Sequence, residues 1–250
     1  MPKYNNLGLV NHAKQALNLK TKYMWGGILR PIEQQYDLLR SIYGNQSGTG
    51  YTAPRWAELA ALRNKGYYGV DCVGMIKSYY WSGKTDGGVG SPKYGAQGYP
   101  DTNANGMFNA ATKKGKIATL PEIPGLIVYC RSHPHVGIYI GNGETIESTL
   151  GNRGDGVVKR PLDSLWEWWF ACPYIDLIDP REQGIHYTVK YAANARSAPS
   201  IKSQFIKKYY PGEDVYLISE TETIDPLTKY KYVQMIDGHW IVKSALKKVK

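Results

Sequence analysis

The sequence predicts an α+β domain, in which helices pack on an antiparallel sheet, followed by a small all-β barrel. Apolar residues recur at helical spacing over residues 72–80, so one face of a helix is expected to be buried there. Alternation over residues 135–148, interrupted by Gly-Asn-Gly, predicts two antiparallel strands joined by a tight turn. From residue 187 onward, closely spaced short strands replace the helical patterns, which is typical of a small barrel.

The chain before residue 72 is predicted to contain several helices. They are expected near residues 9–17, 32–42 and 54–64, with a loop at 44–50 between the last two. Residues 82–105 are rich in Gly, Pro, Asn and Lys, so we expect a long loop there.

Cys72 begins the predicted helix, directly after a glycine-containing bend at residues 65–70. A thiol at a helix N-terminus meets unpaired backbone N–H groups and the positive end of the helix dipole. Both favour the thiolate, which is the nucleophilic form. By position alone, Cys72 fits a reactive nucleophile and a buried structural cysteine equally well.

A histidine and a glutamate downstream favour the reactive alternative. His135 starts the first strand of the predicted hairpin, and Glu147 lies twelve residues later on the returning strand. The turn resets the register, so the spacing does not fix whether the two side chains share a sheet face. On one face they would give Cys72 a base and an acceptor that orients the base. His133 is a rival base, but it precedes Pro134 and is expected in a loop.

Four segments, in this order along the chain, resemble the NlpC-type papain-like cysteine peptidases, which cut the stem peptides of bacterial peptidoglycan. They are residues 23–27 (Tyr-Met-Trp-Gly-Gly), 71–76 (Asp-Cys-Val-Gly-Met-Ile), 123–129 (Ile-Pro-Gly-Leu-Ile-Val-Tyr) and 135–141 (His-Val-Gly-Ile-Tyr-Ile-Gly). The resemblance implies a papain-like peptidase domain over residues 1–180. It implies that Cys72 is the nucleophile, His135 the base and Glu147 the residue that orients His135.

The same resemblance implies that Tyr23, Trp25 and Asp71 bind substrate. The chain departs from the family at Glu147, which stands where His, Asn or Gln is usual, although a carboxylate also stabilises an imidazolium. Val73 replaces a serine that helps to bind a free L-Ala amine in some members, so a free stem N-terminus is less expected to be required. Leu126 replaces an aspartate that we interpret as non-catalytic.

Two insertions lengthen the family pattern, at residues 28–66 and 82–105. Their Tyr and Trp side chains would pack on sugar or peptide if these segments lined the substrate cleft. The alternative is that both are ordinary excursions on the surface.

A second domain is predicted over residues 181–250, after a linker at 179–184. Strands are expected at residues 187–191, 214–218, 231–235 and 240–243. Residues 194–200 (Asn-Ala-Arg-Ser-Ala-Pro-Ser) resemble a signature of bacterial SH3-like domains, and 237–246 resemble their closing segment in shortened form. Such modules bind the cell wall in secreted and phage lytic enzymes, which implies the same role here.

Charge supports an anionic partner. The chain has a formal net charge of +10, and residues 181–250 carry 12 Lys and Arg against 7 Asp and Glu. Peptidoglycan and anionic wall polymers would be attracted to such a surface. Nucleic acid would be attracted too, but no nucleic-acid motif accompanies the charge, so we do not expect it as a partner. No apolar run approaches the roughly 18 residues of a membrane span.

The three cysteines are an odd number, without a Cys-x-x-Cys pair, so neither complete disulfide pairing nor zinc is expected, and no cofactor is implied. Cys130 and Cys172 are predicted to be small core residues. The remaining histidines are predicted to be structural or exposed; they are His12, His186 and His239.

These observations predict a peptidoglycan endopeptidase, expected to cut the bond between γ-D-Glu and the diamino acid. Two alternatives stay open: an N-acetylmuramoyl-L-alanine amidase of the same fold, and a non-catalytic wall-binding or phage tail protein. The N-terminus lacks the apolar core of a secretion signal. With a wall-binding module, this favours a phage-type lysin that is made in the cytoplasm and reaches the wall after release, or acts outside the cell.

Overall fold

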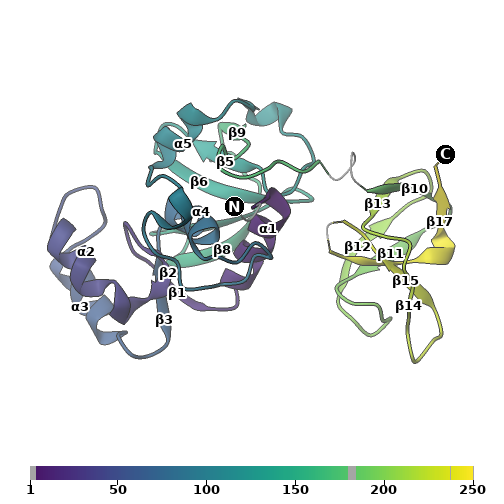
Figure 1. The fold of residues 1–250 in the computed structure, drawn as a ribbon, viewed down its shortest axis with the longest axis horizontal. Coiled ribbons are helices and arrows are strands. Elements are labelled where there is room, and N and C mark those ends of the chain that lie inside the picture. The colour runs from purple at the N-terminus through teal and green to yellow at the C-terminus, as the bar shows by residue number, and fades with distance from the viewer. Residues whose placement is uncertain (1–3, 180–183, 237, 250) are drawn as a thin grey trace. The chain divides into compact units, whose positions relative to one another are not determined.

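The computed structural model describes residues 4–179, 184–236 and 238–249. The chain divides into two compact units, Met1–Leu177 and Ile178–Lys250 (Figure 1). The predicted domain boundary at residues 180/181, with most of the predicted linker, lies outside the described residues.

The first unit is built around one buried helix, α4 (Cys72–Trp81). All of its residues are buried, which is expected of a helix that is largely apolar on every side. Helix α1 (Asn6–Ala16) packs against α4 and begins at Asn5, whose side chain accepts a hydrogen bond from the Gly8 N–H at 2.9 Å. The helix predicted near residues 9–17 is therefore confirmed.

A six-stranded antiparallel sheet lies beside α4 (Figure 1). Its strands, in spatial order, are β4 (Lys114–Lys116), β9 (Trp168–Phe170), β5 (Ile127–Cys130), β6 (His135–Gly141), β7 (Glu144–Thr149) and β8 (Gly156–Pro161). Helix α4 contacts β6 and β7, the two strands of the predicted hairpin. The predicted arrangement of helices on an antiparallel sheet is confirmed.

A second, smaller sheet was not predicted. It consists of β1 (Lys20–Tyr23), β3 (Tyr67–Val70) and β2 (Ile28–Pro31), with β3 in the middle. Strands β1 and β3 are parallel, and their register pairs Tyr23 with Val70. This pairing brings the segment around Tyr23 to the start of α4, because Cys72 follows Val70 by two residues.

The first insertion, residues 28–66, forms a small core of its own. Its helices are a 3-10 turn (Ile32–Gln34), α2 (Tyr36–Tyr43) and α3 (Ala53–Ala61). The helix expected at 32–42 thus starts four residues later than predicted, after the 3-10 turn. Trp56 and Leu59 of α3 pack with Tyr36 and Leu39 of α2.

The second insertion, residues 82–105, is mainly loop, as predicted, with one short 3-10 turn at Ala96–Gly98. Its last two residues already belong to α5 (Ala104–Ala110), so the prediction of loop through residue 105 is wrong there. The reason is Asn103, whose side chain accepts a hydrogen bond from the Gly106 N–H at 2.8 Å and caps the helix. A further 3-10 turn covers Ile117–Thr119.

The second unit contains only strands and one 3-10 turn (Lys243–Ala245) among its described residues. One sheet has the order β13 (Asp214–Leu217), β10 (Ile185–Val189), β17 (Leu246–Lys248). The other has the order β12 (Phe205–Tyr209), β11 (Ala193–Arg196), β16 (Trp240–Val242), β15 (Lys231–Gln234), β14 (Thr223–Ile224). The four strands predicted from the sequence correspond to β10, β13, β15 and β16.

A small all-β barrel was predicted here; the described strands are all-β, as expected, but form two sheets rather than one closed sheet. An isolated bridge between Leu217 and Met235 links the sheets. The five-stranded sheet ends at β14, which has only two residues and therefore few backbone groups to pair with a further strand. Both sheets share one apolar core, to which Tyr187, Val215 and Ile241 contribute.

No helix in the described ranges has the length and apolar content needed to cross a bilayer.

Candidate active site

Cys72 is the first residue of α4, and the residue is 6% exposed. Asp71 caps the helix: its carboxylate accepts hydrogen bonds from the N–H groups of Gly74 and Gly26, the latter at 2.6 Å. A Cβ on Gly74 would lie 1.8 Å from the carbonyl oxygen of Gly27. Only glycine therefore lets the first turn of α4 approach the 24–27 segment this closely, and that approach fixes the position of the thiol.

His135 and Glu147 lie on the same face of the sheet. The register of β6 and β7 places Glu147 opposite Gly137, two residues from His135, so the two side chains are diagonal neighbours. His135 Nε2 lies 2.5 Å from Glu147 Oε2. The Cys72 side chain also forms a hydrogen bond with His135. The structure thus brings the three predicted catalytic residues together.

The electrostatics of this group favour a charged imidazole. Burial lowers the pKa of His135, but hydrogen bonds to Cys72 and Glu147 and the charges of both outweigh it and raise the pKa to about 10. A protonated imidazole beside a cysteine is the arrangement that activates a thiol nucleophile, and the raised pKa of His135 fits that role.

Trp166 packs against the face of the His135 imidazole. Its ring stacks on His135, with 5.5 Å between ring centroids and 14° between planes. Gly137 makes room for it, because a Cβ at that position would come within 2.9 Å of the indole. The sequence analysis missed Trp166, which lies in the loop before β9 and carries no signal that links it to residue 135.

Arg153 is a second residue that the sequence analysis missed. Glu147 is fully buried, and Arg153 Nη2 and Nε lie 2.6 Å and 3.1 Å from its Oε1. Arg153 Nη1 also binds Asp163 Oδ2 at 2.8 Å. Burial raises the pKa of Glu147, but hydrogen bonds from His135 and Arg153 outweigh it, so the pKa lies below its usual range. Sequence reasoning could have anticipated a second partner for Glu147, because a buried carboxylate needs more than one polar partner.

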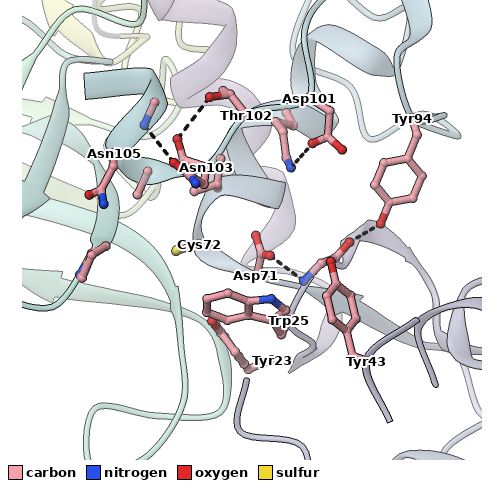
Figure 2. Close-up of a pocket in the computed structure, with 16 residues that line it drawn as sticks. Tyr23, Trp25, Tyr43, Asp71, Cys72, Tyr94, Asp101, Thr102, Asn103 and Asn105 are labelled. Atoms are coloured by element: carbon pink, nitrogen blue, oxygen red, sulfur yellow. Dashed lines mark hydrogen bonds and ion pairs between the residues drawn. The ribbon is translucent and has the colours of Figure 1, made fainter. Parts of the chain in front are cut away.

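A cavity of about 650 Å³ opens beside Cys72 (Figure 2). Its lining residues are Tyr23, Trp25, Gly26, Tyr43, Asp71, Cys72, Val73, Lys77, Tyr94, Asp101, Thr102, Asn103, Ala104, Asn105, Gly106 and Pro134. Tyr43 belongs to the first insertion, and Tyr94 and residues 101–105 belong to the second. This geometry favours the hypothesis that the two insertions line the cleft over the alternative that they are ordinary excursions on the surface.

The three predicted substrate-binding residues all line the cavity. The side chain of Trp25 is 39% exposed. The Tyr23 hydroxyl forms no hydrogen bond with any residue that the structure describes, and burial, with the charges of Cys72 and Asp71, raises the pKa of this phenol. Tyr23 is therefore a protonated donor that a ligand in the cavity would meet.

The Asp71 carboxylate is used in hydrogen bonds within the protein, to the Gly26 and Gly74 N–H groups. Burial raises the pKa of Asp71, while the charge of Lys77 and the two backbone N–H donors lower it in part. Lys77 Nζ itself forms an ion pair with Asp101 Oδ1 at 2.6 Å, and its side chain is 8% exposed. The sequence analysis also missed Lys77. A single lysine in a largely apolar helix is the signal that would have found it.

Among the described cysteines and histidines, Cys72 lines the cavity, and the others, His135 included, lie outside its lining. Cys130 and Cys172 are buried, as predicted, and burial raises the pKa of Cys172 to about 12. His133 is exposed in the turn before β6, which confirms its predicted loop position. His12 is fully buried, its Nε2 lies 2.7 Å from Ser78 Oγ, and burial lowers its pKa to about 4.

In the described residues, no group of three or more His, Cys, Asp or Glu side chains is arranged to hold a metal ion.

No protein-family model matches the chain, and no curated protein matches it. Among solved structures, the chain is similar to the P60 domain of an antigen from M. avium subspecies paratuberculosis, with 19% identity and a TM-score of 0.37 over 67% of this chain and 96% of that chain. It is also similar to the peptidoglycan hydrolase RipB from Mycobacterium tuberculosis, with 20% identity and a TM-score of 0.38 over 70% of this chain and 69% of that chain.

Proposed function

We propose that this protein is a peptidoglycan hydrolase, a cysteine endopeptidase that cuts stem peptides of the bacterial cell wall. The observation that carries the proposal is the His135 ring, which forms hydrogen bonds with the buried Glu147 carboxylate and with Cys72, the residue of the three that lines the cavity. This arrangement matches a nucleophile, a base and an orienting acceptor. The four sequence motifs that surround these residues resemble peptidases that act on peptidoglycan.

In the proposed reaction, the Cys72 thiolate attacks the carbonyl carbon of the scissile amide. The protonated His135 then donates its proton to the leaving amine, and a thioester to Cys72 remains. His135 next accepts a proton from water, which attacks the thioester and releases the carboxylate product and the thiol. Glu147 stabilises the imidazolium in both steps.

Two donors are placed to stabilise the oxyanion. The Cys72 backbone N–H lies at the N-terminus of α4, where it has no partner within the helix. The Tyr23 hydroxyl lines the same cavity and has no hydrogen-bond partner among the described residues. Donors aimed at the developing charge in a buried site contribute strongly to the rate.

The scissile bond is assigned from the resemblance to the NlpC-type peptidases and from one residue, Val73. Val73 lines the cavity where related enzymes that require a free L-Ala amine carry a hydrogen-bonding serine. We therefore infer an internal bond of the stem, between γ-D-Glu and the diamino acid. The second unit, residues 178–250, is proposed to bind the wall as an SH3-like module, and the chain to act on the wall after release from the cytoplasm, as phage-type lysins do.

Digestion of purified sacculi, followed by mass spectrometry of the fragments, tests this proposal. Wild type is expected to release peptide fragments with new amine and carboxyl ends, Cys72→Ala to release none, and Cys130→Ala to behave as wild type because Cys130 lies outside the cavity. Glycan strands stripped of whole stems would instead identify an amidase. Binding without fragments from wild type would identify a non-catalytic wall-binding or tail protein.

A further inference from the structure

We infer that four charged residues act as a positioning device for Tyr23, and we name them the Tyr23 clamp: Lys22, Arg55, Glu58 and Asp155. This inference rests on the proposed function, in which Tyr23 donates a hydrogen bond to the reacting carbonyl. The clamp residues do not line the cavity, so they would act only through Tyr23.

The clamp holds both backbone polar groups of Tyr23. Asp155 Oδ1 accepts the Tyr23 N–H at 3.0 Å, and Arg55 Nη2 donates to the Tyr23 carbonyl at 2.7 Å. Strand β1 is the edge of its three-stranded sheet, so these groups have no neighbouring strand in that sheet on their outer side. Asp155 and Arg55 therefore take the place of the missing strand.

The clamp is internally well connected. Arg55 forms two bonds with Asp155, from Nη1 to Oδ2 at 2.8 Å and from Nη2 to Oδ1 at 2.6 Å. Lys22 Nζ reaches Asp155 Oδ2 at 2.8 Å, and Glu58 accepts from both Lys22 and Arg55 at 2.6 Å. A bidentate pair of arginine with a carboxylate forms charge-assisted hydrogen bonds that are stronger than neutral ones and fix the geometry. Burial raises the pKa of Asp155, but these partners outweigh it and hold the pKa at about 2.

The turn that carries Asp155 is shaped for this contact. Gly154 and Gly156 flank it with φ of +144° and +111°, a region that side chains rarely adopt. A Cβ on Gly156 would lie 2.7 Å from the carbonyl oxygen of Thr21. The turn thus lies against β1 as closely as a backbone allows, and Asp155 faces the strand end at Tyr23.

These contacts give the first insertion a task beyond lining the cleft. Arg55 and Glu58 lie on α3, so the insertion reaches across to β1 and fixes the backbone from which the Tyr23 side chain enters the cavity. The phenol has no side-chain hydrogen bond of its own among the described residues. Its position therefore depends on packing and on the clamp.

Kinetics of two clamp variants test the inference. Arg55→Lys keeps the charge but loses the bidentate pair and the bond to the Tyr23 carbonyl, and Asp155→Asn keeps the shape but loses the charge. Each is expected to lower kcat on a soluble stem-peptide substrate roughly 10-fold to 100-fold, the scale of a misplacement of about 1 Å, with KM within about twofold of wild type. Glu144→Gln is the matched control, because it removes the exposed Lys159–Glu144 pair at 2.8 Å.

A double-mutant cycle separates positioning from general weakening of the fold. If the clamp acts through the phenol, Arg55→Lys should cost little more once Tyr23→Phe has removed the hydroxyl. Additive losses in kcat, or an unchanged kcat in both clamp variants of an active enzyme, would overturn the inference and leave the proposed hydrolase intact.

Hydrogen exchange at the Tyr23 amide provides a readout that needs no activity. The amide is expected to exchange faster in Asp155→Ala than in wild type, by roughly 10-fold or more, because its acceptor is gone. The exchange rate in Glu144→Gln should not change. Equal rates in Asp155→Ala and wild type would disprove the clamp even in a protein that releases no fragments, a result that would separately disprove the proposed function.

Discussion

At the scale of single residues, Glu147 shows how the protein accommodates a buried carboxylate beside the proposed base, His135. It is fully buried, yet each oxygen faces a cationic partner, His135 on one side and Arg153 on the other. A buried carboxylate is tolerated only when such partners are in place. Arg153 is therefore as much part of this arrangement as Glu147 itself.

Glu147→Gln tests this pairing. The amide can still accept a hydrogen bond from His135, but the charge that stabilises the imidazolium is lost. We therefore expect kcat to fall roughly 10-fold to 100-fold, which is less than the 10²–10⁴-fold that general acid–base catalysis contributes as a whole. Arg153 loses its buried partner, so the free energy of unfolding should fall by roughly 3 kcal/mol. Peptide hydrolysis and urea unfolding measure the two effects. A variant as active and stable as wild type would show that the carboxylate charge is dispensable.

The pKa shifts give stability a defined pH dependence. The pKa of His135 is raised to about 10, so its stabilising contribution is complete below the unfolded value of about 6.5 and is lost as pH rises to about 10. The pKa of Glu147 is lowered, so its contribution is present above the unfolded value of about 4.3 and is lost as pH falls through the folded pKa. Urea unfolding at pH 6, 8 and 10 should therefore show a smaller decline in His135→Asn than in wild type. Equal declines would contradict the raised pKa.

At the scale of elements, the structure decides how the second insertion meets the central helix. Lys77 of α4 and Asp101 of the insertion form a short ion pair, and the Tyr94 hydroxyl donates to the Gly26 carbonyl. Both contacts attach the loop at the cavity wall, across from Cys72 (Figure 2). The loop is therefore a wall of the cavity that is attached through these polar contacts.

Asp101→Asn is expected to loosen this wall. Asp101 is largely exposed, but the Lys77 side chain is only 8% exposed and is left without its anionic partner, so KM should rise roughly 3-fold to 10-fold, more than the 0.2–1 kcal/mol of a fully exposed pair would give. The change in kcat should be small, because Cys72, His135 and Glu147 are untouched. Faster tryptic cleavage after Lys84 and Lys93 would report the loosened loop directly. Asp86→Asn, in the same insertion but outside the cavity lining, is the control.

At the scale of the whole molecule, the two units have separate cores, and we propose that the first hydrolyses the wall and the second binds it. The cavity belongs to the first unit, and the denser positive charge belongs to residues 181–250. In this unit Lys190 and Lys208 form no ion pair with a described residue. Both lie beside exposed tyrosines, Tyr191 and Tyr210. Such a surface fits an anionic polymer with sugar or polyol units.

Wall binding should follow this charge. With Cys72→Ala as the non-cutting background, Lys190→Gln and Lys208→Gln should each weaken sedimentation with purified walls roughly fivefold, the value of about 1 kcal/mol for one lysine at an anionic surface. Lys159→Gln, in the first unit, should have no such effect. The difference should vanish in high salt and on walls stripped of anionic polymer. Equal binding of all three variants would place the wall contact elsewhere.

Short-range patterns were enough to predict much of this protein. The start of α4 at Cys72, the hairpin of His135 and Glu147, and the helices of the first insertion follow from spacing, capping and turn residues, which act over a few positions. Strands β11 and β14 were missed because Ala-Asn-Ala-Arg and a two-residue strand have too little β-propensity to stand out.

Only the tertiary structure decided what surrounds the predicted site. The side of the sheet on which Glu147 lies depends on the register across the turn, and its pairing with Arg153 depends on the path of a loop. The bond between Asp155 and Tyr23 joins residues 132 positions apart, and no local pattern specifies such a contact. The sequence by itself singled out Cys72, His135 and Glu147 as the candidate catalytic residues, because the motifs and caps that point to them are local. The fold decided what holds them in place, because those partners meet only when distant segments pack together.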